Sequence, residues 1–157
     1  MISTKWLYGG RDSGMKDAHQ IRRSVFIEEQ NVPDAIEMDG LDEDAVHLVV
    51  YEDKKPVATG RMLINDGHGG GDNELTIGRV AVLKEKRGRG YGGLVMRMLI
   101  RKAFEKGFTM QYIHAQVSVR GFYETLGFQA YGGAYEEAGI PHLPMRRKGD
   151  IGGGCAF

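Results

Sequence analysis

Glycines at alternate positions form the part of this sequence whose chemistry is easiest to define. They are Gly88, Gly90 and Gly92 in the run RGRGYG, residues 87–92. Glycine has no side chain to hold a ligand away, so the N–H groups of such a run can converge on one anion. A helix that starts directly after the glycines would add unpaired donors and partial positive charge. The pattern predicts a pyrophosphate site, reinforced by nearby cations: Lys84, Lys86, Arg87 and Arg89.

Two common phosphate-binding motifs do not fit this stretch. The P-loop ends in Gly-Lys-Ser/Thr, and no such pair follows these glycines. The dinucleotide fingerprint is G-x-G-x-x-G, whereas the spacing here is G-x-G-x-G. A glycine turn with solvated cations is the alternative that this pattern leaves open.

The elements that must position these residues follow from hydrophobic periodicity and from breaker residues. Strands are predicted at 3–8, 46–52, 56–65, 74–83 and 110–117, with two final candidates in FQAYGG and HLPMRRK. Helices are predicted at 15–30 and 91–106, with a short one after Ser118 that Gly127 ends, and 66–73 reads as a flexible loop. The order predicts an α/β protein of the α+β kind, with an antiparallel meander followed by a β-α-β-α-β half.

Composition limits the classes of function. The chain has 157 residues and equal numbers of acidic and basic side chains, which favours one domain at 1–148 and argues against a nucleic-acid partner or a membrane surface. Residues 149–157 read as a disordered tail. The single cysteine, Cys155, allows no internal disulfide, so a cytoplasmic location is expected. No histidines have metal-ligand spacing, so no metal is predicted.

Two motifs together resemble the GCN5-related N-acetyltransferases (GNAT family). Arg87, Gly90 and Gly92 match the family's Arg/Gln-x-x-Gly-x-Gly/Ala motif for acyl-CoA, and GFYETLGF at 121–128 matches its FYxxxGF signature. Two further segments, 26–50 and AGIPHLPM at 138–145, resemble the ElaA-type subgroup. The resemblance covers roughly 15–147. It implies a mixed sheet of six or seven strands, splayed between the fourth and fifth and flanked by about four helices, with acyl-CoA in the resulting V.

The resemblance also implies roles for individual residues. Tyr123 falls on the tyrosine that hydrogen-bonds the CoA sulfur and protonates the departing thiolate, although an ordinary core aromatic is the alternative. Gln116 stands where the family commonly has Asn. The backbone of the fourth strand would pair with pantetheine, and an N–H there, such as that of Val80, would meet the oxyanion. The implied cofactor-binding residues are Val80, Ala81, Val82, Arg87, Gly88, Arg89, Gly90, Tyr91, Gly92, Gln116 and Tyr123.

The base that deprotonates the acceptor amine is less defined. An alkyl ammonium has a pKa near 10, so a group must take its proton directly or through water. The candidates are Glu28, Glu29, Asp39, Glu74 and His114. Arg79 interrupts an apolar run and needs a partner, and two readings stay open: it lines the acceptor pocket with an acid from 28–39, or it forms a structural ion pair. His142 either reaches the acceptor or anchors a turn.

The predicted function is an N-acetyltransferase that moves an acetyl group from acetyl-CoA to a small-molecule amine or an exposed amino group. A non-catalytic acyl-CoA-binding module is the alternative. The predicted acceptor-binding residues are Arg79, Asp39 and His142. The protein is expected to act as a monomer or homodimer.

Overall fold

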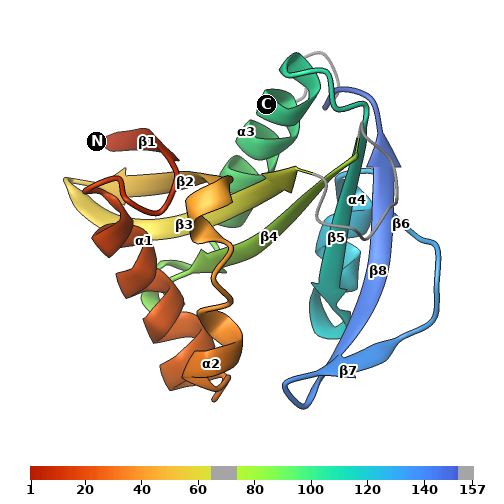
Figure 1. The fold of residues 1–157 in the computed structure, drawn as a ribbon, viewed down its shortest axis with the longest axis horizontal. Helices are drawn as coiled ribbons and strands as arrows, with labels where there is room; N and C mark the ends of the chain where they lie inside the picture. The colour runs from red at the N-terminus through yellow and green to blue at the C-terminus, as the bar shows by residue number, and fades with distance from the viewer. Residues whose placement is uncertain (65–73, 152–157) are drawn as a thin grey trace.

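The computed structural model describes residues 1–64 and 74–151 and contains one open, twisted sheet with helices on both faces (Figure 1). The strands are β1 (Ile2–Tyr8), β2 (Ala45–Glu52), β3 (Lys55–Ile64), β4 (Glu74–Val82), β5 (Met110–Gln116), β6 (Gln129–Ala130), β7 (Tyr135–Glu137) and β8 (Ile140–Lys148). The α-helices are α1 (Met15–Arg22), α2 (Asp34–Glu37), α3 (Tyr91–Glu105) and α4 (Arg120–Thr125). The loop predicted at 66–73 and Cys155 lie outside the described residues.

The sheet order confirms the predicted mixed architecture. Strands β1 to β4 form an antiparallel meander, β5 pairs parallel with β4, and β8 pairs antiparallel with β5. The described residues form eight strands rather than six or seven, because the short β6 and β7 both pair with β8. β7 was not predicted, since its three residues are all exposed and carry no hydrophobic alternation.

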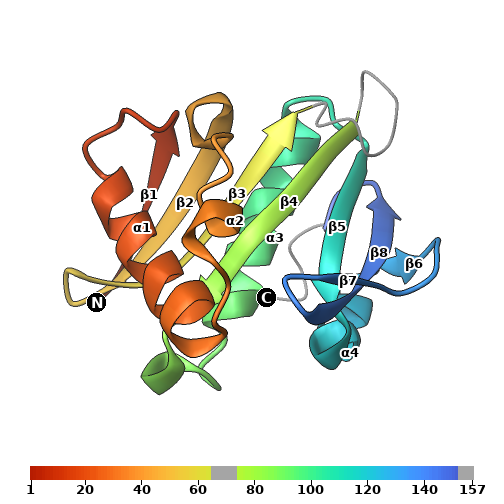
Figure 2. The same cartoon turned by 60° about the horizontal axis from the view of Figure 1, so that its bottom comes forward.

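The sheet opens between β4 and β5, as predicted. The two strands are paired only between Glu74–Ile77 and Met110–Ile113, and beyond this they diverge (Figures 1 and 2). A bulge in β4 begins directly after Gly78, where Arg79 has a φ of 52° and the register with β3 shifts. A bulge bends and twists its strand, so it accounts for the departure of β4 from β5.

Apolar clusters on the two faces of the sheet fix the helices. α3 packs on one face through a stripe that includes Val95 and Leu99. Gly60 of β3 permits this close approach, because a Cβ there would lie 2.7 Å from side-chain atoms of both residues. α1 packs on the opposite face with Met15, Ala18 and Ile21, so it lies on the other side of the sheet from α3 (Figure 2).

The helix predicted at 15–30 has two parts. α1 ends at Arg22, and Arg23–Glu29 continue as a π-helix (η1). The periodicity of the apolar residues does not distinguish the two forms, because the core-facing residues of α1 already define the stripe. π-helical turns occur frequently at functional sites.

The other local predictions are met with small changes. α3 begins directly after the glycine loop, and a short 3₁₀ turn at Val117–Val119 precedes α4. Residues 149–151 are ordered, with Ile151 buried in the core, and the rest of the predicted tail lies outside the described residues. No helix in 1–64 or 74–151 has the length and apolar character to cross a membrane.

Candidate active site

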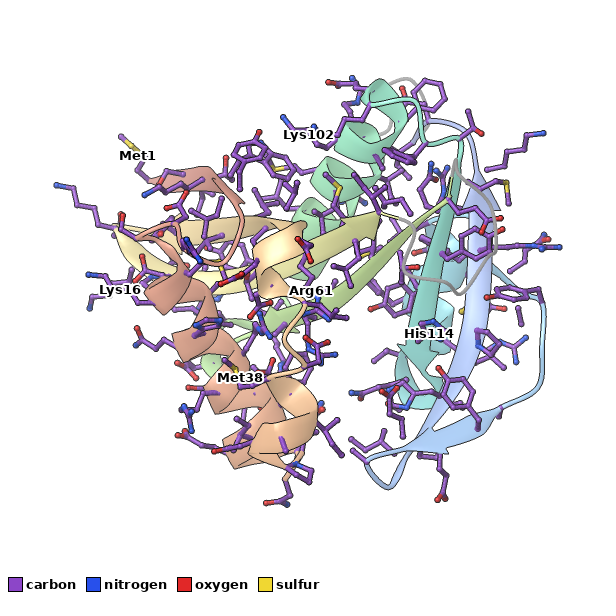
Figure 3. The ribbon with its side chains drawn as sticks, in the orientation of Figure 1. Met1, Lys16, Met38, Arg61, Lys102 and His114 are labelled. Atoms are coloured by element: carbon purple, nitrogen blue, oxygen red, sulfur yellow. The ribbon has the colours of Figure 1, made fainter. Side chains whose placement is uncertain are left out.

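A cleft of about 1200 Å³ occupies the opening between β4 and β5. Figure 3 shows Arg61 and His114 on its two walls. The predicted site residues that line it are Asp39, Arg79, Val80, Ala81, Val82, Arg87, Gly88, Gly90, Tyr91, Gly92, His114, Gln116, Tyr123 and His142. Glu28, Glu29 and Arg89 are not among its lining residues. The fold therefore gathers most of the predicted residues in one place.

The glycine loop presents bare backbone to this cleft. Gly88 and Gly90 have φ angles of 79° and 85°, and Gly90 is the N-cap residue of α3. A Cβ built on either would meet no described atom within 4 Å, whereas one on Gly92 would face Phe122 and Val82 at 3.6 and 3.8 Å. The left-handed angles explain the need for glycine at 88 and 90, and the open space allows an anion to reach the loop.

The cations of the loop are already paired with carboxylates. Arg87 donates to both carboxylate oxygens of Glu29 at 2.6 and 2.8 Å, and also to the carbonyl of Val82 at 3.1 Å. The hydrogen bond from Arg87 keeps the pKa of Glu29 below its ordinary value. Glu29 therefore lies at the edge of the glycine loop as the partner of a phosphate-binding candidate.

Glu52 at the end of β2 has the same role on the other side of the loop. It lies 3.1 Å from Lys86 and 3.6 Å from Arg89, and it accepts a hydrogen bond from the Tyr91 hydroxyl. The hydrogen bond from Tyr91 lowers the pKa of Glu52, and the same contact raises the pKa of Tyr91. Sequence reasoning missed Glu52, because nothing in the local pattern of β2 indicates a partner 34 residues later.

Tyr123 lies on α4 among aromatic rings. Its ring centroid is 5.0 Å from that of Phe122 and 6.0 Å from that of Phe128, both in edge-on geometry. Burial raises the pKa of Tyr123 to about 12. The phenol is therefore protonated at neutral pH, which is the state that a proton donor requires.

The β5 wall carries a cluster of polar side chains. Gln116 donates to Gln30, the residue after η1, at 2.9 Å, and this contact joins β5 to the opposite wall. The Tyr135 hydroxyl is 2.6 Å from Nδ1 of His114, and the Tyr135 ring stacks on His142. Gln30 and Tyr135, both absent from the sequence prediction, therefore belong to the lining of the cleft.

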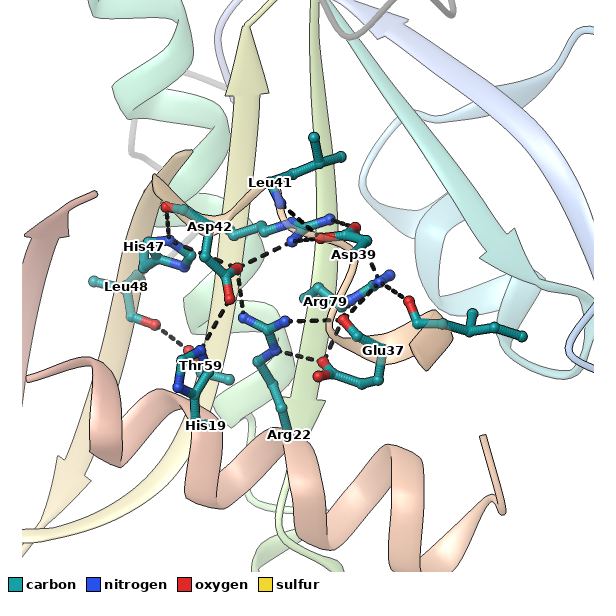
Figure 4. A network of polar contacts seen from close by, with 12 residues as sticks. His19, Arg22, Glu37, Asp39, Leu41, Asp42, His47, Leu48, Thr59 and Arg79 are labelled. Atoms are coloured by element: carbon teal, nitrogen blue, oxygen red, sulfur yellow. Dashed lines mark hydrogen bonds and ion pairs between the residues drawn. The ribbon is translucent and has the colours of Figure 1, made fainter. Parts of the chain in front are cut away.

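A network of charged side chains lies beside β4 and reaches the cleft through Asp39, Arg61 and Arg79 (Figure 4). Arg22 contacts Glu37 at 2.5 Å and Asp42 at 2.8 Å, and both arginine and glutamate are almost fully buried. Arg61 donates to Asp39 at 2.5 Å and to Asp42 at 3.0 Å. Arg61 was not predicted, although a cation inside the apolar run VATGRMLI offered the same signal as Arg79.

Arg79 belongs to this network. It donates to the carboxylate of Asp39 and to the backbone carbonyls of Ile36 and Glu37, all at 3.1 Å, and lies 3.4 Å from the Glu37 carboxylate. Burial lowers the pKa of Arg79. Its carboxylate partners, Glu37 and Asp39, are acids from 28–39, as the acceptor-pocket reading of Arg79 expects. Because Glu37 also binds Arg22 of α1, the network ties the first helix to the sheet, and Arg79 lines the cleft as well.

The remaining base candidates differ in their surroundings. Burial acts to raise the pKa of Asp39, but the hydrogen bond from Arg61 acts against this and keeps the pKa below its ordinary value. Glu28 is exposed, and Glu74 accepts a hydrogen bond from Tyr112 at 3.0 Å and does not line the cleft. Within 1–64 and 74–151, no three His, Cys, Asp or Glu side chains are grouped as a metal site.

Comparison with known proteins identifies the class to which this fold and cleft belong. Residues 13–148 match the family described as "Acetyltransferase (GNAT) domain". The chain is 37% identical over 134 residues to YjcF of Bacillus subtilis, which is named an uncharacterized N-acetyltransferase, with 85% of this chain and 91% of YjcF covered.

Solved structures give the same class. The crystal structure of Escherichia coli ElaA matches with a TM-score of 0.82 and 31% identity, over 94% of this chain and 100% of ElaA. An acyl-CoA N-acyltransferase from Pseudomonas aeruginosa matches with a TM-score of 0.83 and 31% identity, over 94% of this chain and 99% of that one. The chain belongs to the GNAT acetyltransferase family, and it is an acyltransferase of that type.

Proposed function

We propose that this protein transfers an acetyl group from acetyl-CoA to a primary amine of a small molecule or to an exposed amino group. The transfer is a direct attack in a ternary complex, with no acyl-enzyme intermediate. The observation that carries the proposal is that one cleft holds both the open glycine loop and Tyr123. The first supplies donors for a diphosphate, and the second supplies a protonated phenol.

Coenzyme A would lie in the opening of the sheet, along the edge of β4 that faces β5. The backbone N–H groups of Gly88 to Gly92 and the start of α3 would hold its diphosphate. The pantetheine arm would pair with Val80 to Val82, where β4 has left β5, and would direct the thioester toward Tyr123. The N–H of Val80, next to the bulge, would stabilise the oxyanion.

Tyr123→Phe tests the proposal, because it removes only the hydroxyl. We expect coenzyme A affinity to stay within about twofold, while kcat for acyl transfer falls by about 10²-fold or more, the range for loss of a general acid. Acyl transfer is followed by thiol release from acetyl-CoA with a panel of alkylamines, polyamines, amino acids and short peptides. Tyr8→Phe, on the exposed end of β1, is the matched control and should keep full turnover.

Two outcomes would contradict the proposal. Full turnover by Tyr123→Phe would remove the phenol from the reaction. Binding of acetyl-CoA without transfer to any amine in the panel would favour the non-catalytic acyl-CoA module. We also propose that the protein is cytoplasmic and that it acts as a monomer or a homodimer. Size-exclusion chromatography with light scattering would distinguish the two oligomeric states.

A further inference from the structure

The ring of His142 on β8 is fixed by one hydrogen bond. Its Nδ1 lies 2.7 Å from the backbone carbonyl of Ile140. A carbonyl oxygen can only accept, so Nδ1 carries the hydrogen. In the neutral imidazole, Nε2 then holds the free lone pair. The contact anchors the β7–β8 turn, and it leaves the other nitrogen of the ring in a state that can accept a proton.

The neighbouring strands hold this ring against the cleft. His142 pairs with Gln116 of β5 and with Tyr135 of β7, so the three side chains lie on one face of the sheet. The Tyr135 ring stacks on the imidazole with centroids 5.9 Å apart and an interplanar angle of 25°. His142 is half-buried and lines the cleft, and its Nε2 has no hydrogen bond to the described residues. Its position is therefore fixed before a substrate arrives.

The other candidates for the base are less suited to receive a proton in this cleft. Glu29 and Asp39 are held as carboxylates by arginines, and Glu28 does not line the cleft. His114 uses Nδ1 in a contact with the Tyr135 hydroxyl, and its Nε2 is buried away from solvent. His142 thus combines a defined tautomer with access to the cleft.

We propose that Nε2 of His142 is the general base that deprotonates the acceptor ammonium. This inference rests on the proposed function. Nε2 takes one proton from the ammonium, and the neutral amine attacks the thioester carbonyl to form the C–N bond. Collapse of the tetrahedral intermediate breaks the C–S bond, and the thiolate takes the Tyr123 proton. The second proton on nitrogen then restores the phenol, and His142 releases the first to solvent.

Several titratable and charged groups lie near His142 and bear on the pH dependence of the reaction. Tyr135 of β7 stacks on its ring and also contacts His114 of β5, and Glu137, Glu37 and Arg79 line the same smaller recess as His142. The proposed base acts in its unprotonated form, so the pH profile of kcat/KM should have an acid limb. Substitution of His142 should remove this acid limb.

Two measurements test the inference. Nitrogen-15 NMR of the histidine-labelled full chain should show the Nδ1–H tautomer for His142, assigned by its loss in His142→Gln. A neutral Nε2–H tautomer would overturn the proposal without any acceptor being present. Kinetically, His142→Gln should lower kcat by about 10²-fold and lose the acid limb, while coenzyme A affinity stays within about twofold. Added imidazole should restore part of the rate.

Controls separate this inference from the proposed function. Tyr8→Phe, on the exposed end of β1 outside the cleft, should transfer at the wild-type rate. If the wild type is active and His142→Gln keeps both its rate and its acid limb, the base assignment fails and the acetyltransferase proposal stands. If His142→Gln loses rate, imidazole does not restore it and the acid limb is retained, then His142 has a purely structural role and the base assignment also fails. If the wild type transfers to no amine, both proposals fail.

Discussion

The side-chain amides of Gln30 and Gln116 form a bridge between the two walls of the cleft. Gln116 donates to Gln30 at 2.9 Å, and the reverse bond measures 3.4 Å. The two residues are 86 positions apart; Gln30 directly follows η1, and Gln116 is the last residue of β5. The bridge links the wall that carries Tyr135 and His142 to the segment that precedes α2, so it holds the splayed sheet at one width.

We therefore expect the two glutamines to be energetically coupled. In a double-mutant cycle of Gln30→Ala and Gln116→Ala, the coupling in the free energy of unfolding should be about 0.5–1.5 kcal/mol, the usual value of one hydrogen bond. Urea denaturation measures it. Gln20→Ala, on the exposed side of α1, should be additive with Gln116→Ala. Strict additivity of the bridge pair would mean that the contact does not persist in solution.

The carboxylate of Glu29 should oppose coenzyme A. It neutralises Arg87 in the free protein, and it would lie close to the diphosphate in the complex. We expect Glu29→Gln to increase coenzyme A affinity several-fold and Arg87→Ala to decrease it about tenfold, both effects shrinking at high salt. Calorimetry at two ionic strengths measures this. Pantetheine, which lacks the diphosphate, is the control ligand, and an equal effect of Glu29→Gln on pantetheine would contradict the assignment.

Substitution of Gly92 tests the access of the ligand to the loop without the effect of backbone strain. It is not one of the glycines with positive φ, and a Cβ there would make only ordinary contacts. We expect Gly92→Ala to leave the melting temperature within about 2 °C, yet to weaken coenzyme A binding by about tenfold or more, because the methyl group would enter the cleft. Gly90→Ala should in addition cost about 1–2 kcal/mol of stability, owing to its left-handed angle. Gly133→Ala is the exposed control, and unchanged binding by Gly92→Ala would count against the loop as the diphosphate site.

The charged network predicts acid sensitivity. Burial acts to raise the pKa of Asp42, but hydrogen bonds from Arg22, His19 and Arg61 act against this and keep the pKa well below its ordinary value. The stability that this carboxylate contributes is present in full above its unfolded pKa of about 4, and is lost as pH falls toward the folded pKa. Asp42→Asn should cost about 3–5 kcal/mol at pH 7, because it leaves buried arginines short of a partner, and should flatten the acid limb.

Urea denaturation between pH 7 and pH 3 measures this effect. Asp34→Asn, at an exposed carboxylate on α2, should follow the wild-type curve. Two results would show that the network does not supply this pH dependence: no decrease in the wild-type free energy of unfolding at pH values below about 4, or an Asp42→Asn curve parallel to that of the wild type.

The sequence was sufficient for the features that depend on local pattern. The glycines at 88, 90 and 92, the strand before them and the FYETLGF segment predict the loop, α3 and α4 correctly, because turn chemistry and hydrophobic period are local properties. The splay between β4 and β5 followed from the family resemblance rather than from the pattern.

Other features depend on contacts that no local pattern contains. The pairing of Arg87 with Glu29 spans 58 residues, and the bridge of Gln30 with Gln116 spans 86. The local sequence therefore shows the cations of the loop but not their carboxylate partners, Glu29 and Glu52. The cost of burying a lone charge predicts that Arg79 needs a partner, and the same rule applies to Arg61, but the rule does not identify the partner in either case.

A crystal structure with bound coenzyme A tests the central claim most directly. The account predicts the diphosphate on the backbone amides of Gly88 to Gly92, with the sulfur within hydrogen-bonding distance of the Tyr123 hydroxyl. Coenzyme A bound away from this loop, or a sulfur directed away from Tyr123, would contradict it.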